Sequence, residues 1–207
     1  MPFVTSVKPQ KNNKRLNIFI DGKFSFGIDL DNFVNFKLKE GQEVSDEEVE
    51  KIIKASDFSK NLDKLIRFAM VRPRSEKEIK DYFKRKKVPT TLQEGLFNRL
   101  KSLNLLDDLE FTKWWVEQRR DYSNKSKRQI IFELKNKGVD KETMDLVLNE
   151  QSFDDNEMAY MLILKNEHKW VRFDTKIKKQ KIAAYLSSKG FDWDNINYAI
   201  DKYCQKS

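Results

Sequence analysis

The chain has 207 residues, of which 39% are hydrophobic and 36% charged, and its net charge is +8. Fifteen phenylalanines, six tyrosines and four tryptophans are too many aromatic residues for a disordered chain, so we expect a folded, basic protein. The sequence has no apolar run of about 18 residues and no apolar signal-peptide core, which argues against a membrane span and against export. A single cysteine, Cys204, cannot form an internal disulfide, and we therefore expect a cytoplasmic protein.

The residues that enzymes and metal sites need are scarce. His168 is the one histidine, and no Cys-x-x-Cys, His-Glu-x-x-His or glycine-rich phosphate-binding motif occurs in the sequence. The paired aspartates at 107–108 and 154–155 stand where helix N-caps are expected, and adjacent helical residues point in different directions. We expect no catalytic residue, no metal and no cofactor, and we predict that the protein is not an enzyme.

The excess positive charge lies in the middle of the chain. Residues 1–59 hold nine basic and ten acidic residues, a net charge of −1. Residues 60–150 carry a net charge of +7, and residues 151–207 carry +2. This shift in composition predicts a first domain boundary near residue 58.

The first segment has the pattern of a small antiparallel sheet. Two alternating runs, 15–20 and 23–28, flank Asp21-Gly22, and a two-residue turn of this type favours a β-hairpin because both positions need positive φ. Residues 3–7 can add a third strand, which Pro9 would end. A sheet this small must pack against something else to be stable.

Two helices are predicted after the sheet. Residues 30–38 indicate a short helix, and Ser45 with Glu48 forms a capping box that opens a helix through about Ala55. The segment can act as a stabilising cap on the rest of the chain or as a docking surface for a partner. Its balanced charge favours the cap.

From residue 60 onward, apolar positions repeat with offsets of 51 and 52 residues. Isoleucine recurs at 79, 130 and 182, and large apolar residues recur at 83, 134 and 186 and again at 88, 139 and 191. A period of about 50 residues indicates stacked supersecondary units that cannot each bury an apolar face alone. We predict a mainly α fold: an elongated, curved, solenoid-like tandem array of three three-helix repeats, preceded by the small three-stranded segment. The predicted domains are residues 1–58, 59–105, 106–151 and 152–207.

Helix boundaries within the repeats follow from capping residues. Gly138 and Gly190 stand where a glycine ends the middle helix, and Asp140 and Asp192 follow as N-caps of the third helix. In the second repeat we expect helices over 108–122, 125–137 and 141–150. Apolar residues at helical spacing, among them Trp114, Trp115 and Trp193, are expected in the core.

Each middle helix is preceded by, or carries, a cluster of basic residues. In stacked repeats equivalent positions follow one another along one surface, so these clusters predict a basic stripe that would attract a nucleic-acid backbone or an acidic protein polymer. In the third repeat the lysines can equally be a solvated helix face. The candidate partner-binding residues are Arg72, Arg74, Lys77, Lys84, Arg119, Arg120, Lys125, Lys127 and Arg128.

Several segments resemble the RecX family of regulators of the RecA recombinase. The motif Arg-Pro-Arg-Ser-Glu-Lys-Glu-Ile at 72–79 is similar to that family's Arg-Pro-Arg-Ser-Glu-Lys-Glu-Leu signature. Leu-Asp-Asp-Leu-Glu-Phe at 106–111 and Gly-Phe-Asp-Trp-Asp-Asn-Ile at 190–196 match further blocks. The hairpin, with Ile-Asp-Gly-Lys-Phe at 20–24, is similar to the N-terminal extension of Gram-positive members. The family glycine is absent at Lys87, and Met70-Val71 stands where an aromatic residue often precedes Arg-Pro.

The resemblance implies a non-enzymatic protein that binds the RecA filament on single-stranded DNA along its groove. It implies that the protein modulates, and mostly inhibits, RecA ATPase, strand exchange and co-protease activity in recombination, DNA repair and the SOS response. We separately expect a monomer. The basic stripe can face RecA or the DNA phosphates, with weak direct DNA contact in the second case. Two alternatives stay open: a nucleic-acid-binding helical module that acts without RecA, and a scaffold for an unrelated acidic protein.

Overall fold

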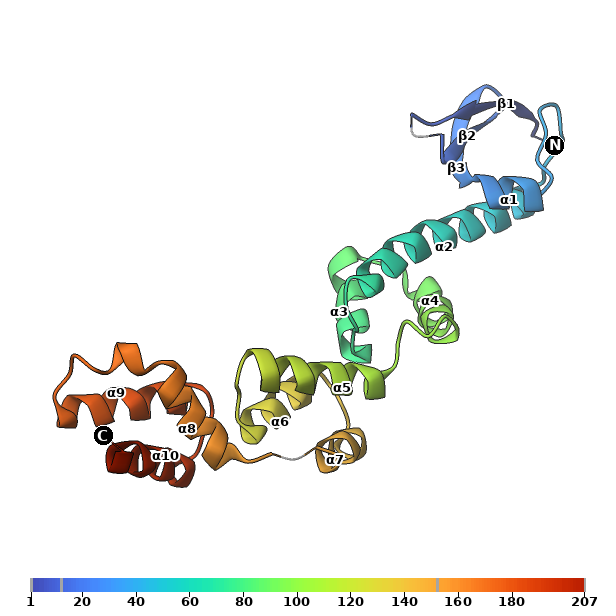
Figure 1. The fold of residues 1–207 in the computed structure, drawn as a ribbon. Coiled ribbons are helices and arrows are strands. Elements are labelled where there is room, and N and C mark those ends of the chain that lie inside the picture. The colour runs from blue at the N-terminus through green and yellow to red at the C-terminus, as the bar shows by residue number, and fades with distance from the viewer. Residues whose placement is uncertain (1, 12, 152, 207) are drawn as a thin grey trace. The chain divides into compact units, whose positions relative to one another are not determined.

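The computed structural model describes residues 2–11, 13–151 and 153–206. In this part of the chain, three strands are followed by ten α-helices, so the mainly α class is confirmed (Figure 1). Two compact units are formed, one by residues 1–72 and 83–105 and the other by residues 73–82 and 106–207. The predicted boundary between the second and third repeats includes Ser152, which lies outside the described residues, as do Met1 and Ser207 at the outer limits of the predicted domains.

The N-terminal sheet has the order β1-β2-β3 and is antiparallel throughout. Its strands are β1 (Val4–Pro9), β2 (Arg15–Ile20) and β3 (Lys23–Asp29). Asp21 and Gly22 form the β2–β3 turn with φ angles of 48° and 79°. The predicted hairpin is therefore confirmed, because this turn needs positive φ at both positions.

The second helix after the sheet is longer than predicted, because it does not end near Ala55. After α1 (Leu30–Asn35), the capping box at Ser45 forms as expected, but α2 runs from Asp46 to Met70. The segment after Ala55 has no glycine or proline, and the Ser56 hydroxyl donates to the carbonyl oxygen of Gly27 at 2.6 Å. The sheet therefore uses the hydroxyl that could otherwise have competed for the helix backbone. Residue 58, where we predicted a domain boundary, lies inside α2.

Three sets of three helices follow one another along the chain. The first set is α2, α3 (Glu76–Lys86) and α4 (Thr90–Ser102). The second is α5 (Asp108–Glu117) with a π-helical turn at Gln118–Tyr122, α6 (Lys127–Asn136) and α7 (Lys141–Asn149). The third is α8 (Asp155–Lys165) with a 3-10 turn at Glu167–Lys169, α9 (Thr175–Ser188) and α10 (Trp193–Lys206).

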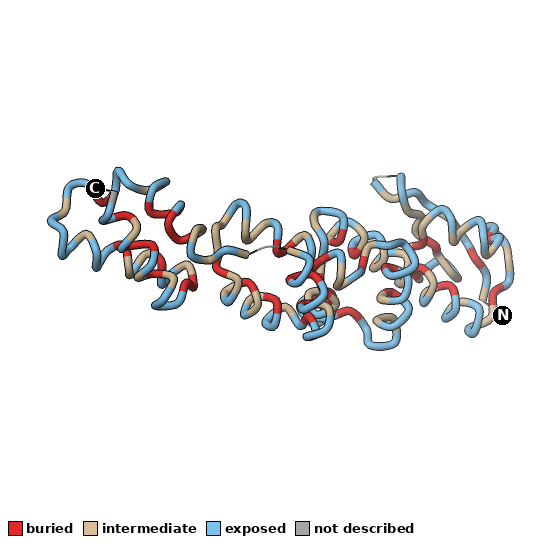
Figure 2. Tube along the Cα trace, turned by 60° about the horizontal axis from the view of Figure 1, so that its bottom comes forward, coloured by how far each residue is buried: buried red, intermediate tan, exposed pale blue. Residues whose placement is uncertain are grey.

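Burial confirms the period that the sequence predicts. The recurring isoleucines Ile79, Ile130 and Ile182 are 0%, 0% and 1% exposed, and the apolar residues at the other equivalent positions are buried as well. Along the helices, buried residues alternate with exposed ones, as expected for helices with one apolar face (Figure 2).

The helix ends agree with the capping residues. Gly138 and Gly190 end their helices with φ of 79° and 90°. Lys87, which replaces glycine in the first repeat, adopts φ of 51°. This left-handed conformation is less favourable for lysine than for glycine, because lysine has a Cβ atom. Asp140 accepts a hydrogen bond from the Thr143 N–H at 2.7 Å, and Asp192 accepts one from Asn195 at 2.9 Å.

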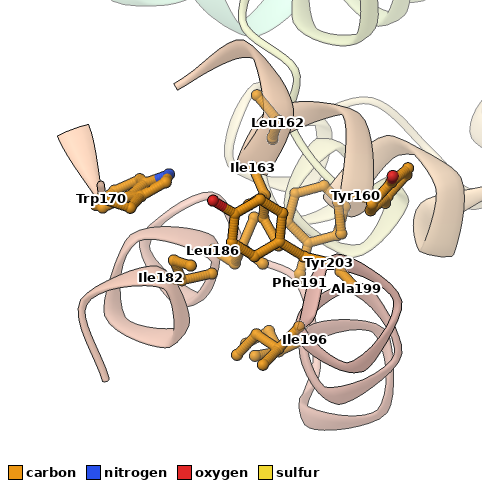
Figure 3. Close-up of a cluster of buried hydrophobic side chains, with 12 residues drawn as sticks. Tyr160, Leu162, Ile163, Trp170, Ile182, Leu186, Phe191, Ile196, Ala199 and Tyr203 are labelled. Atoms are coloured by element: carbon orange, nitrogen blue, oxygen red, sulfur yellow. The ribbon is translucent and has the colours of Figure 1, made fainter. Parts of the chain in front are cut away.

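The third repeat encloses its own hydrophobic core, which α8, α9 and α10 share (Figure 3). Ile163, Leu186 and Phe191 are among its most buried side chains, and Trp170 packs at the edge of the same cluster. The expectation that Trp193 belongs to the core is wrong, because this side chain is 65% exposed. Trp193 is the first residue of α10 and directly follows Asp192, which caps this helix, so it lies in the first turn.

Candidate partner-binding surface

The candidate surface is organised by the N-termini of the three middle helices. Ser75 caps α3, since its Oγ accepts from the Glu78 N–H, and Ser126 caps α6 by accepting from Gln129, both at 3.2 Å. Asp174 has this role for α9 and accepts from the Ile177 N–H at 2.9 Å. A side-chain cap satisfies backbone donors that the first helical turn otherwise leaves unpaired.

The two serines also connect each middle helix to the next repeat. Ser75 Oγ donates to the carbonyl oxygen of Lys137 at 2.8 Å, and Ser126 Oγ donates to that of Gly190 at 2.6 Å. Both serines are almost fully buried. Each hydroxyl thus bridges the start of one middle helix and the end of the next, across more than 60 residues of sequence.

An aspartate completes each of these connections. Asp108 Oδ1 accepts a hydrogen bond from the Glu76 N–H at 2.8 Å, and Asp155 accepts one from the Lys127 N–H at 3.2 Å. We call the pairs Ser75 with Asp108 and Ser126 with Asp155 the inter-repeat clasps. In each predicted aspartate pair only the first residue, Asp107 or Asp154, caps its own helix, while the second binds the helix of the preceding repeat.

Glycine is needed at the clasps because two backbones approach closely there. A Cβ atom on Gly138 would lie 2.9 Å from Lys77 Cβ, and one on Gly190 would lie 2.5 Å from Gln129 Cβ. This close approach is a constraint separate from positive φ. Gly41 has φ of 79° as well, but a Cβ atom there would meet nothing within 4 Å. The clasps therefore join the start of α3 to the end of α6, and the start of α6 to the end of α9, through the same kinds of contact.

Arg119, a candidate contact residue, is already bound within the second repeat. Its Nε donates to Glu133 Oε2 at 2.6 Å, and its guanidinium lies 4.0 Å from the centre of the Trp115 ring. The Lys137 ammonium lies 5.0 Å from the same ring and forms an ion pair with Glu78 at 2.6 Å. Glu133 neutralises the charge of Arg119, which makes this side chain a structural element of the repeat.

Arg120 is also paired. Its Nε donates to Asp121 at 2.6 Å, and its Nη1 donates to Gln151 at 2.9 Å. The hydrogen bond from Arg120 lowers the pKa of the Asp121 carboxyl group below its ordinary value. A partner that recruited Arg120 would have to compete with this carboxylate.

The other candidate residues differ in how much of their charge is available. Lys77 donates to the Asn136 carbonyl oxygen at 2.8 Å, and the Lys127 ammonium lies 5.5 Å from the centre of the Phe153 ring. Arg72 and Arg74 are half-buried in the segment before α3. Lys84 and Arg128 are exposed, and neither side chain has an ion pair or hydrogen bond within the described part of the chain.

A second basic cluster contains residues that the sequence analysis did not single out. Lys125 donates to the Ser188 carbonyl oxygen at 3.5 Å, and Lys189 donates to that of Ser123 at 3.3 Å. Lys165 and Lys169 lie nearby, and burial together with these three lysines lowers the pKa of Lys189. Lys165, Lys169 and Lys189 are scattered along the sequence, so no charge run marks them before the chain is folded.

The described residues contain no group of three or more histidine, cysteine or acidic side chains that could hold a metal ion. His168 lies exposed in the 3-10 turn after α8, and Cys204 is exposed on α10. Among the described helices, none combines the length and apolar composition that a membrane span requires.

Three family models match the chain. They are the regulatory protein RecX N-terminal domain at residues 2–45, the RecX second three-helix domain at 107–148 and the RecX third three-helix domain at 154–200. The matches follow the three-stranded segment and the second and third helix sets described above.

Curated relatives and solved structures agree with these matches. Regulatory protein RecX of Bacillus licheniformis is 35% identical over 98% of this chain and 78% of the relative, and that of Bacillus subtilis is 33% identical over 98% and 77%. The fold resembles a crystal structure of regulatory protein RecX with a TM-score of 0.68, 23% identity and coverage of 97% of this chain and all of the other. A RecX structure from Lactobacillus salivarius gives a TM-score of 0.57 at 24% identity, over 72% of this chain and 97% of the other.

Proposed function

Because the chain belongs to the RecX family of regulatory proteins, we propose that it regulates the RecA recombinase by binding RecA filaments on single-stranded DNA. The proposed effect is mostly inhibitory and extends to ATP hydrolysis, strand exchange and co-protease activity. The observation that carries this proposal is the family match over nearly the whole chain. The recurrence of basic residues at the start of α3 and of α6 supports it, since a repeated charge suits a polymeric partner.

Among the proposed contact residues, we assign the leading roles to Lys84 and Arg128. Both are exposed, and no carboxylate among the described residues pairs with them. Arg119 and Arg120 are less suitable for charge reversal. Glutamate at position 119 would face Glu133 in place of an ion pair, so the folded repeat would lose stability as well as a contact.

The test is the rate of RecA ATP hydrolysis on single-stranded DNA while this protein is titrated in below the RecA concentration. We expect a dose-dependent fall in the rate. The double variant K84E/R128E should need at least a tenfold higher concentration to give the same inhibition. The matched control is K23E/K39E, which reverses two exposed lysines in the charge-balanced N-terminal segment and should inhibit like wild type. An unchanged ATPase rate with wild-type protein contradicts the proposal, and equal loss in both variants contradicts the assigned surface.

A second function, direct nucleic-acid binding without RecA, is favoured by Lys189 and the three lysines near it, because none of the four has a carboxylate partner within the described part of the chain. This function predicts that inhibition disappears once free single-stranded DNA is in excess. Inhibition that persists under excess DNA favours the filament.

A further inference from the structure

Four lysines meet where the second and third repeats join. They are Lys125 before α6, Lys165 at the end of α8, Lys169 in the 3-10 turn and Lys189 after α9, and we call them the junction lysines. All four belong to the same compact unit. Three segments that are distant in the sequence therefore contribute ammonium groups to one place.

Hydrogen bonds place two of these lysines side by side. Lys125 Nζ reaches from the loop before α6 to the Ser188 carbonyl oxygen at the end of α9, at 3.5 Å. Lys189 Nζ reaches in the opposite direction to the Ser123 carbonyl oxygen, at 3.3 Å. Because the two contacts are reciprocal, they tie the loop before α6 to the end of α9.

Tyr185 holds a third lysine against the same site. The Lys169 and Lys189 ammonium groups each lie 5.7 Å from the centre of its ring. Its hydroxyl accepts a hydrogen bond from Asn166 Nδ2 at 3.3 Å, and Asn166 Oδ1 accepts one from Lys169 at 2.7 Å. One aromatic side chain and one amide therefore position two cations from different segments.

The charge at this junction is not compensated. No carboxylate among the described residues forms an ion pair with any junction lysine. Glu167, which lies between Lys165 and Lys169 in the sequence, accepts instead from the Tyr203 hydroxyl at 2.9 Å. Desolvation, followed by repulsion from the other three lysines, lowers the pKa of Lys189. A bound anion would offset the repulsion between these lysines.

We propose that the junction lysines bind the phosphodiester backbone of single-stranded nucleic acid. Lysine ammonium groups bind phosphate oxygens as point charges, and here they come from three segments of the chain with no carboxylate paired to them among the described residues. A phosphodiester backbone presents one negative charge per nucleotide, which suits several such cations at one place. The inference rests on the proposed function and deepens it. The junction lysines would contact the DNA of the nucleoprotein filament, separately from the contacts assigned to Lys84 and Arg128.

Two of the junction lysines also stabilise the fold, and in the described part of the chain the side chains of the other two do not donate to the backbone. Lys125 and Lys189 donate to carbonyl oxygens at helix ends, a contact that stabilises the fold by itself. Lys165 and Lys169 are exposed, and among the described residues their ammonium groups donate to no backbone carbonyl oxygen. The test therefore changes Lys165 and Lys169 and leaves the other two in place.

The experiment measures binding of the full chain to fluorescein-labelled oligothymidylate by anisotropy, without RecA, across a range of salt concentrations. Each contact with a single-stranded phosphate contributes about 0.7 to the slope of log K against log salt, so the variant K165Q/K169Q should lower the slope by about 1.4. At a salt concentration of about 0.1 M the same two contacts correspond to an affinity loss of roughly 25-fold. The matched control, K176Q/K179Q, removes two exposed charges from α9 of the same repeat.

A fall confined to K165Q/K169Q, with unchanged circular dichroism and melting temperature, supports the junction site. Equal losses in both variants would overturn it in favour of diffuse attraction, and absence of wild-type binding would overturn it directly. Displacement of the oligonucleotide by poly-glutamate at equal charge would also overturn it, since an acidic protein would then be the better partner. None of these outcomes decides the proposed function, which the ATPase measurement tests through Lys84 and Arg128.

Discussion

Gly190 ends α9 and lies against Ser126 and Gln129 at the start of α6. Its φ of 90° disfavours any side chain, and a Cβ atom would also lie 2.9 Å from Ser126 Oγ and 2.5 Å from Gln129 Cβ. The backbone conformation costs alanine about 1–2 kcal/mol, and overpacking of this kind adds about 1–3 kcal/mol. Position 190 therefore combines two separate penalties.

We predict that G190A lowers the free energy of unfolding by about 2–5 kcal/mol. The control is G41A, which has a similar φ of 79° but nothing within 4 Å of the new Cβ atom, and which should cost about 1 kcal/mol. Urea denaturation followed by circular dichroism measures both. Equal losses in the two variants would mean that backbone conformation, and not the close approach to α6, sets the requirement for glycine.

Single residues also show why positive charge in a sequence does not identify a binding surface. Arg119 and Lys84 are both basic and both belong to predicted clusters, yet Glu133 neutralises Arg119 while Lys84 has no carboxylate partner in the described residues. The difference depends on where the π-helical turn after α5 places Arg119 and where α6 places Glu133. No spacing rule connects these two residues before the helices have packed.

At the scale of the element, the N-terminus of α6 depends on a carboxylate that comes from another helix. Asp155 accepts from the Lys127 N–H, but burial raises the pKa of this carboxyl group more than the hydrogen bond lowers it, and Asp192 raises it further. The folded protein therefore holds this proton more tightly than the unfolded chain does. The contribution of Asp155 to the free energy of unfolding falls as pH rises from its ordinary pKa of 3.8 through the raised folded value.

We predict that D155N is at least as stable as wild type at pH 7, because the amide oxygen still accepts the hydrogen bond and carries no charge to desolvate. This advantage should vanish as pH falls through the folded pKa, where the wild-type carboxyl group becomes neutral. D155A, which lacks the acceptor, should lose about 1–2 kcal/mol at a pH below the ordinary pKa of the group, and less as pH rises through the folded pKa. Denaturation at a series of pH values provides the measurement, and a D155N variant less stable than wild type at pH 7 would show that the ionic hydrogen bond outweighs burial.

At the scale of the whole molecule, the hydrophobic side chains form separate clusters. The N-terminal cluster includes Ile18 and Ile28, the second repeat has one around Phe111 and Leu134, and the third repeat has one that includes Leu186. In arrays of this kind each repeat is stabilised by its own core and by its neighbours. Loss of one core should therefore remain largely local.

We predict that L186A, which truncates a fully buried side chain, costs about 2–5 kcal/mol and opens the third repeat first. Hydrogen exchange followed by mass spectrometry should show lost protection in α8, α9 and α10, with that of β1, β2 and β3 unchanged. I18A is the matched variant for the N-terminal cluster and should give the opposite pattern. Uniform loss of protection in either variant would mean that the chain unfolds as one cooperative unit.

The sequence by itself determined the hairpin, the period of the three repeats and most helix ends, because these features follow from turn residues, caps and apolar spacing within short stretches of chain. Tertiary structure decided the continuation of α2 through Ser56, the exposure of Trp193 and the clasps. It also decided which basic residues are neutralised and which lysines meet around Tyr185. These features join residues that are distant along the chain, so they arise only when folding brings a hydroxyl, a carboxylate or an ammonium group to its partner.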